Sequence, residues 1–310
     1  MASEPILTAF DLPIARRSPL SDSRIWLDYF ALTKPEVNFL IVITTFAGFY
    51  LGWPSGSHDF PFLRSINAVL GTLLVASGTG ALNQYLERKF DAQMRRTSRR
   101  PLAAGRLKPS VVLWFGIALS VVGTVYLAAA VNLLTSLLAL GTLLSYLFLY
   151  TPLKRKSPLC TLVGAFPGAM PPLIGWAAAS GQLSFGAWTI YSVLFLWQFP
   201  HFMSIAWMYR EDYARASYIV LPQDERAKMR LVNWQTLLPL LLLAPVSLLP
   251  VLTSKASAAY FVGDVLLCAG FLYYGARFVR RRSNSSARQL LSASILYLPS
   301  LFALMILVRV

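Results

Sequence analysis

The chain has 310 residues, of which 56% are hydrophobic and only 13% are charged, and its formal net charge is +15. This composition lies outside the range of ordinary soluble domains and indicates a membrane protein. A nucleic-acid partner is not expected, because the basic residues are better interpreted as a signal of membrane topology, with anionic lipid nearby.

Nine apolar runs are long enough to cross a hydrocarbon core of about 30 Å. They are residues 37–52, 65–86, 109–129, 132–150, 159–179, 186–207, 232–252, 257–279 and 290–308. We therefore expect an all-α polytopic membrane protein with nine transmembrane helices around a central cavity. Residues 1–35 lack the apolar core of a signal peptide, and we expect them to form a flexible cytoplasmic N-terminal tail. Residues 36–310 are expected to form one membrane domain.

The basic residues are distributed unequally between the two sides of these spans. One side carries 25 of the 28 Lys and Arg residues, which predicts that the N-terminus and every even-numbered loop are cytoplasmic. Two cytoplasmic loops, 86–108 and 208–230, are long and contain acids as well. They follow the second and sixth spans, as expected if the chain consists of two pseudo-repeated four-helix halves. Symmetry of this kind commonly puts a substrate site between the halves.

The first long loop is preceded by an oxygen-rich motif. Asn83, Glu87 and Asp91 are spaced i, i+4, i+8, which puts them on one face of a helix. Their oxygens suit Mg²⁺, which is commonly shared with substrate phosphates. Downstream arginines, Arg96 and Arg100 among them, offer charge-assisted hydrogen bonds to phosphate oxygens. The pattern predicts a diphosphate site, and the alternative is a set of solvated ion pairs at the membrane interface.

The later spans add further candidates. In the second long loop, Glu211 and Asp212 are predicted to hold a second ion on the same anion. His201 is a functional candidate because ionisable side chains inside a membrane are costly. Pro200 is expected to kink its span, and an imidazole that merely bonds a freed carbonyl is the alternative. Cys160 and Cys268 both fall inside spans, where we expect packing rather than a disulfide or a metal pair.

Five segments carry a more specific signal. In chain order they are "NQYLERKFDAQMRRTSRRPLAAG", "YTPLKRKSPL", "GAMPPLIGWAAASG", "WQFPHF" and "YREDYARASYIVLP". Together they resemble the successive motifs of the protohaem IX farnesyltransferase family, within the UbiA-type intramembrane prenyltransferases. The resemblance implies a nine-helix enzyme of the cell inner membrane whose active site faces the cytoplasm and which requires Mg²⁺. It also implies transfer of the farnesyl group of farnesyl diphosphate to the 2-vinyl group of haem B, giving haem O and diphosphate. Because haem O supplies haem-copper oxidases, haem A synthase and terminal oxidase assembly factors become candidate partners.

The resemblance assigns roles to individual residues. The family's metal and diphosphate positions fall on Asn83, Glu87, Asp91 and Asp212. Its basic positions that face the diphosphate fall on Arg96, Arg100, Lys154 and Arg155. His201 matches the histidine of its "PHF" motif, for which we expect ligation of the haem iron or, second, proton removal. Two positions depart from the family pattern: Ser217 stands where Gly is usual, and Cys160 stands where Asn is common.

Composition and spacing alone reach only a membrane transferase that uses a prenyl diphosphate. Within that class the alternative to haem is an aromatic acceptor of the quinone type. A transporter with carboxylates at the bilayer midplane is a rival, but the acids here cluster at cytoplasmic helix ends. An assembly scaffold for an oxidase is a third hypothesis, and it predicts no metal-dependent turnover.

Overall fold

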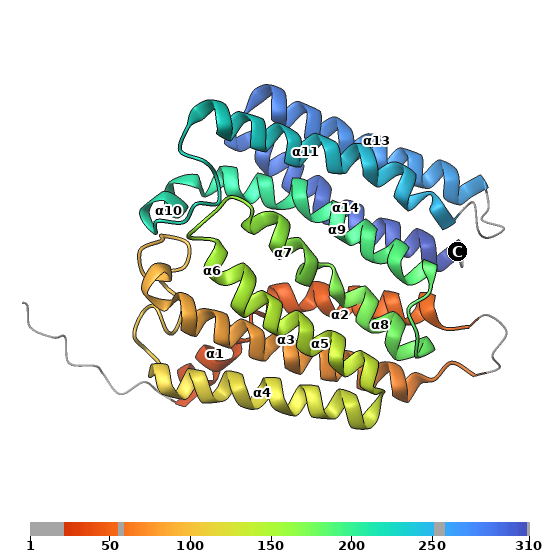
Figure 1. Ribbon diagram of the computed structural model, residues 1–310, viewed down its shortest axis with the longest axis horizontal. Coiled ribbons are helices and arrows are strands. Elements are labelled where there is room, and N and C mark those ends of the chain that lie inside the picture. The colour runs from red at the N-terminus through yellow and green to blue at the C-terminus, as the bar shows by residue number, and fades with distance from the viewer. Residues whose placement is uncertain (1–21, 55–58, 251–257, 309–310) are drawn as a thin grey trace, which may run out of the picture.

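The computed structural model describes residues 22–54, 59–250 and 258–308, and all regular secondary structure in these ranges is helical. The helices run alongside one another as a single bundle (Figure 1). Their bounds are α1 (Asp22–Leu32), α2 (Pro35–Gly52), α3 (Phe62–Asp91), α4 (Pro109–Ala130), α5 (Leu133–Ser145), the π-helix η1 (Tyr146–Tyr150), α6 (Thr151–Leu153), α7 (Cys160–Gly168), α8 (Met170–Ser180), α9 (Phe185–Met208), α10 (Arg210–Arg215), α11 (Glu225–Ser247), α13 (Ala258–Arg281) and α14 (Asn284–Val308).

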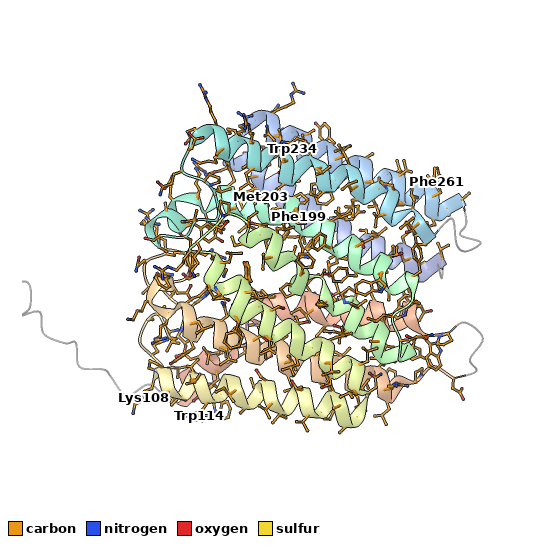
Figure 2. The ribbon with its side chains drawn as sticks, in the orientation of Figure 1. Lys108, Trp114, Phe199, Met203, Trp234 and Phe261 are labelled. Carbon is orange, nitrogen blue, oxygen red and sulfur yellow. The ribbon has the colours of Figure 1, made fainter. Side chains whose placement is uncertain are left out.

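Eight segments of the described chain are long and apolar enough to cross a membrane, which confirms a multi-pass helical protein. They are α2, α3, α4, residues 133–153, residues 160–180, α11, α13 and α14. The outer surface of the bundle is apolar as well, because large side chains such as Trp114 and Trp234 are well over half exposed, and Figure 2 shows Trp114 at the edge of the bundle. Phe199 and Met203, by contrast, are buried inside the bundle. The exposed belt is therefore the surface that contacts lipid.

Small residues bring α2 and α8 unusually close together. A side chain at Gly48 would collide with the carbonyl oxygen of Pro172, and one at Gly175 would collide with that of Thr45. In lipid, where no hydrophobic force drives helices together, such close backbone contact is a main source of packing energy. The α2–α8 pair therefore forms a rigid centre for the bundle.

Two expected spans are interrupted helices. The 159–179 span divides at Ala169 into α7 and α8, because Pro167, Pro171 and Pro172 supply no backbone N–H for helical hydrogen bonds. The Gln198 side chain donates to the carbonyl of Ala165 at 3.1 Å, next to this break. The 132–150 span is also not one α-helix, since α5 passes through the π-turn η1 into α6.

The N-terminal region differs from the expected flexible tail. Residues 1–21 lie outside the described chain, but residues 22–32 form α1. Asp28 on this helix accepts three bonds of 2.9 to 3.0 Å from the Arg106 guanidinium. Gln84 on α3 donates to the carbonyl of Leu32 at 3.0 Å. These contacts fasten α1 against α3 and the segment that follows it. Elsewhere, both cysteines are free and buried, as predicted.

Candidate active site

The last turns of α3 carry the predicted oxygen motif into the protein interior. Asn83, Glu87 and Asp91 are only 1%, 5% and 1% exposed. The helix runs five residues beyond the predicted span end at 86 and ends at Asp91, which confirms that the three residues share one helix. This extension carries Glu87 and Asp91 and keeps them on the same helix as Asn83, at the end of the bundle where the long loops lie.

Each of these three side chains accepts a hydrogen bond from a different cation. Lys34 Nζ lies 2.7 Å from Asn83 Oδ1, and Lys154 Nζ lies 2.8 Å from Glu87 Oε1. The Arg100 guanidinium lies 2.7 Å from Asp91 Oδ2. The other oxygen of Asp91, Oδ1, is buried without a hydrogen-bond partner. Because buried polar groups need compensation, these cations stabilise the buried carboxylates of Glu87 and Asp91 and the amide of Asn83.

The π-turn η1 explains how Lys154 reaches Glu87. The backbone N–H of Thr151 bonds to the carbonyl of Tyr146, five residues earlier, which widens the helix by one residue at this turn. Thr151 then faces α3, where its hydroxyl accepts a 3.2 Å bond from Asn83 Nδ2. Lys154 follows one turn later. Single π-turns are frequent at functional sites, and this one aligns two polar side chains with the α3 motif.

The second long loop meets the first through Asp212. This residue of α10 is buried and accepts the backbone N–H of Arg96 at 3.1 Å, while its other oxygen pairs with Arg215. Glu211, beside it, is exposed. The two loops lie together at the left end of the bundle in Figure 1. Residues 208–230 are not all loop, however, because α10 lies within them and α11 begins at Glu225.

The remaining predicted basic residues lie at the rim of this cluster. The guanidinium of Arg96 lies over the ring of Tyr209, 4.9 Å from its centroid. That of Arg155 lies 4.2 Å from the centroid of Phe90. Both side chains are exposed, and neither forms an ion pair with the α3 carboxylates within the described chain. Aromatic stacking holds them extended at the edge of the site, where an incoming anion would meet them.

Burial and neighbouring charges shift the pKa values of the two lysines of the cluster. Burial, reinforced by the neighbouring Arg100, lowers the pKa of Lys34 to about 7. Burial also opposes the charge on Lys154, but Glu87, Tyr150 and Tyr146 together outweigh it and raise the pKa of Lys154 well above its usual range. Lys154 is therefore held as a cation, whereas Lys34 is close to losing its proton near neutral pH, chiefly because it is buried.

The donor set fits Mg²⁺ better than a transition metal. Asn83, Glu87, Asp91 and Asp212 offer oxygen atoms only, and Asp91 Oδ1 is buried and unpartnered. In the described chain no group of three His, Cys, Asp or Glu side chains is arranged to hold a metal alone. Mg²⁺ does not require such a cage, because it usually takes one or two carboxylates and completes its shell with water and substrate phosphates.

His201 lies apart from this cluster, on the part of α9 that contacts α14. Its Nδ1 is 2.8 Å from the hydroxyl oxygen of Ser294. The ring stacks on Trp197 with centroids 4.6 Å apart. No carbonyl freed by Pro200 bonds to it. His201 is seven residues before the end of α9, or about 10 Å along the axis.

The structure adds site residues that sequence reasoning missed. Lys34 was counted with the tail, yet it reaches Asn83. Thr151 also contacts Asn83, and Tyr218 is buried against the cluster, where burial raises the pKa of its phenol. The only sequence signal for Lys34 was a cation directly before Pro35, at the start of the first apolar run.

Known proteins are similar to this chain over most of its length. The profile of the UbiA prenyltransferase family matches residues 41–302. A Protoheme IX farnesyltransferase of Solibacter usitatus is 48% identical over 91% of this chain and 98% of its own. One from Salinibacter ruber is 44% identical over the same shares.

Among solved structures, a digeranylgeranylglyceryl phosphate synthase aligns with a TM-score of 0.75 at 16% identity, covering 92% of this chain and 99% of that one. A UbiA homolog from Archaeoglobus fulgidus bound to GPP and Mg²⁺ aligns with a TM-score of 0.59 at 17% identity, covering 90% and 99%. The two structures show a shared fold.

Proposed function

The chain belongs to the UbiA prenyltransferase family, and on this premise we propose that it transfers the farnesyl group of farnesyl diphosphate to haem B. The products are haem O and diphosphate. The curated relatives named Protoheme IX farnesyltransferase, 41–48% identical over 91% of the chain, support this acceptor and this donor. The observation that carries the proposal is the buried Asn83–Glu87–Asp91 motif, paired with three cations at the end of an apolar bundle.

We assign binding of the diphosphate group to this cluster. We assign Mg²⁺, shared with the diphosphate, to Asn83, Glu87, Asp91 and Asp212, in keeping with the Mg²⁺ of the Archaeoglobus fulgidus homolog. When bound, the metal would stabilise negative charge on the diphosphate oxygens. The cations that now pair with these residues would then be free to bind phosphate oxygens. They are Lys34, Arg100, Lys154 and Arg215, with Arg96 and Arg155 at the rim.

The reaction breaks the bond between C1 of the farnesyl chain and the diphosphate oxygen. Positive groups around the leaving diphosphate favour this step, because charge develops on it in the transition state. The 2-vinyl group of haem B then donates its electron pair to the allylic carbon, which forms the new carbon–carbon bond. Water then adds to the resulting cation beside the porphyrin and loses one proton, which gives the hydroxyl group of haem O, so that one water is consumed for each diphosphate released. The apolar bundle excludes bulk water from the allylic cation until the acceptor is in place.

We assign His201 to the haem end, as a ligand to the iron. A neutral imidazole is a good haem ligand, and a fixed iron–imidazole bond would hold the vinyl group in register with the allylic carbon. His201 lies about 10 Å deeper along α9 than the rim where Asp212 follows, and so a haem bound there would extend toward the diphosphate site. Proton removal is the second role.

For the topology we propose nine crossings, with α9 as the ninth beside the eight apolar segments. Its 24 residues span about 36 Å, and it packs between α11 and α14. The 25 basic residues on one side support a cytoplasmic N-terminus and a cytoplasmic active site. Residues 36–310 would then form one prenyltransferase domain of two four-helix halves in the cell inner membrane.

The decisive experiment incubates the purified protein in detergent micelles with haem B, farnesyl diphosphate and Mg²⁺. We expect a haem product heavier by the farnesyl group and one hydroxyl in mass spectrometry, and no product when EDTA removes the metal. A parallel reaction replaces haem B by 4-hydroxybenzoate, an aromatic quinone precursor. Prenylation of the benzoate with no change to haem would reassign the acceptor, while no product with either would refute the transferase proposal.

A further inference from the structure

Ser294 on α14 contacts two aromatic rings of α9 at once. Its hydroxyl oxygen lies 2.8 Å from Nδ1 of His201, and its carbonyl oxygen accepts a 2.8 Å bond from the indole N–H of Trp197. The two rings stack on each other, with an interplanar angle of 25°. Ser294 itself is fully buried. Ser294 therefore fixes the positions of both the His201 imidazole and the Trp197 indole that stacks on it.

The hydrogen bonds around Ser294 determine where the imidazole proton lies. The Ser294 hydroxyl is 2.6 Å from the carbonyl oxygen of Leu291. A carbonyl can only accept, and a hydroxyl has a single proton, so Ser294 donates to Leu291. Toward His201 the same oxygen can then only accept. The proton between them must come from Nδ1, which leaves a lone pair on Nε2. Within the described chain Nε2 has no hydrogen-bond partner.

We propose that Ser294 is a positioning residue, which holds His201 as the Nδ1–H tautomer and presents the Nε2 lone pair to the haem iron. The inference rests on the proposed function, since that function supplies the haem. Metal-bound histidines usually donate their second ring N–H to a protein acceptor, which fixes the tautomer and the ring orientation. Here the acceptor is a buried serine, and the stacked Trp197 prevents the ring from turning about its axis.

The tautomer can be measured without any haem. The chain has only two histidines, so ¹⁵N-histidine labelling of the full-length protein gives signals from two rings, and His58→Gln assigns them. We expect a protonated Nδ1 and an unprotonated Nε2 for His201. Ser294→Ala should convert this to a mixture, while Ser294→Thr should keep it. Ser204→Ala is the matched control, because the Ser204 hydroxyl bonds the backbone carbonyl of His201 rather than its ring.

Haem titration followed by absorption spectroscopy tests the consequence for ligation. Ser294→Ala should weaken haem binding about tenfold, at the lower end of the loss seen when such partners of metal-bound histidines are removed, and should shift the haem spectrum. Ser294→Thr and Ser204→Ala should behave as wild type. A protonated Nε2 in the wild-type protein, or an unchanged tautomer in Ser294→Ala, would overturn the positioning role. A His201→Ala protein with wild-type haem affinity and spectrum would instead overturn iron ligation, even if Ser294 controlled the tautomer.

Discussion

Asp91→Asn should nearly abolish turnover while leaving the fold intact. The amide has the shape of the carboxylate, so the buried position stays filled. The change removes one negative charge and the carboxylate oxygen Oδ1, which has no protein partner and is proposed to bind the metal. Loss of electrostatic stabilisation of this kind raises the barrier by about 3 kcal/mol, or roughly a hundredfold in rate. The Arg100 side chain left behind is 26% exposed and can be hydrated, so the free energy of unfolding should fall by only about 1 kcal/mol.

The assay is formation of the farnesylated haem, with the thermal unfolding midpoint in micelles measured on the same sample. Glu225→Gln is the control, because this carboxylate is 72% exposed and pairs only with Lys228, away from the site. It should keep full activity. Asp212→Asn should resemble Asp91→Asn. If both aspartate variants retained more than about a tenth of wild-type turnover, the assignment of these carboxylates to the metal and diphosphate would be wrong.

Four further changes test other contacts. Lys34→Met should raise the KM for farnesyl diphosphate about tenfold and leave haem binding unchanged, since its amine reaches the anion side of the site; an effect on haem titration alone would contradict this. Arg100→Ala should weaken farnesyl diphosphate binding, with partial rescue by Arg100→Lys, which lacks the forked guanidinium; impaired haem binding instead would reassign Arg100 to the haem propionates. A double-mutant cycle of Glu87→Gln and Lys154→Met should give a coupling energy of about 1 kcal/mol or more in unfolding experiments, and simple additivity would show the pair to be energetically independent. Ser217→Gly should raise the free energy of unfolding by up to about 1 kcal/mol, because Ser217 has a φ of 55°, which strains an L-residue; a destabilised variant would show that the strain is absent.

Sequence reasoning predicted the features that depend on local periodicity. The apolar runs became helices, and the four-residue spacing of Asn83, Glu87 and Asp91 became a buried row on α3. The family resemblance was confirmed by the comparisons. The structure explains why the family pattern has Gly at position 217. The backbone of Ser217 is left-handed, a conformation that glycine adopts without strain.

What sequence reasoning missed depends on tertiary contacts or on interruptions inside apolar runs. Residues 22–32 do not form an apolar run, and only tertiary contacts, the bonds from Arg106 to Asp28 and from Gln84 to Leu32, show why they form a helix. The break at Ala169 was not predicted, because residues 159–179 stay apolar on both sides of it. The partner of His201 lies 93 residues away, on a helix whose serine carries no pattern of its own.

The pairing of distant segments also bears on how the enzyme is made. Glu87 meets its lysine 67 residues later in the chain, and Asp212 meets the backbone of Arg96 across 116 residues. During translation, the α3 carboxylates therefore enter the membrane well before the segments that complete the site have left the ribosome. On the proposed mechanism, a nascent or prematurely terminated chain that stops before Asp212 lacks one of its metal ligands and is inert toward farnesyl diphosphate. On the same proposal, biosynthesis couples the ability to ionise an allylic diphosphate to insertion of α9, the helix that carries the proposed haem ligand His201.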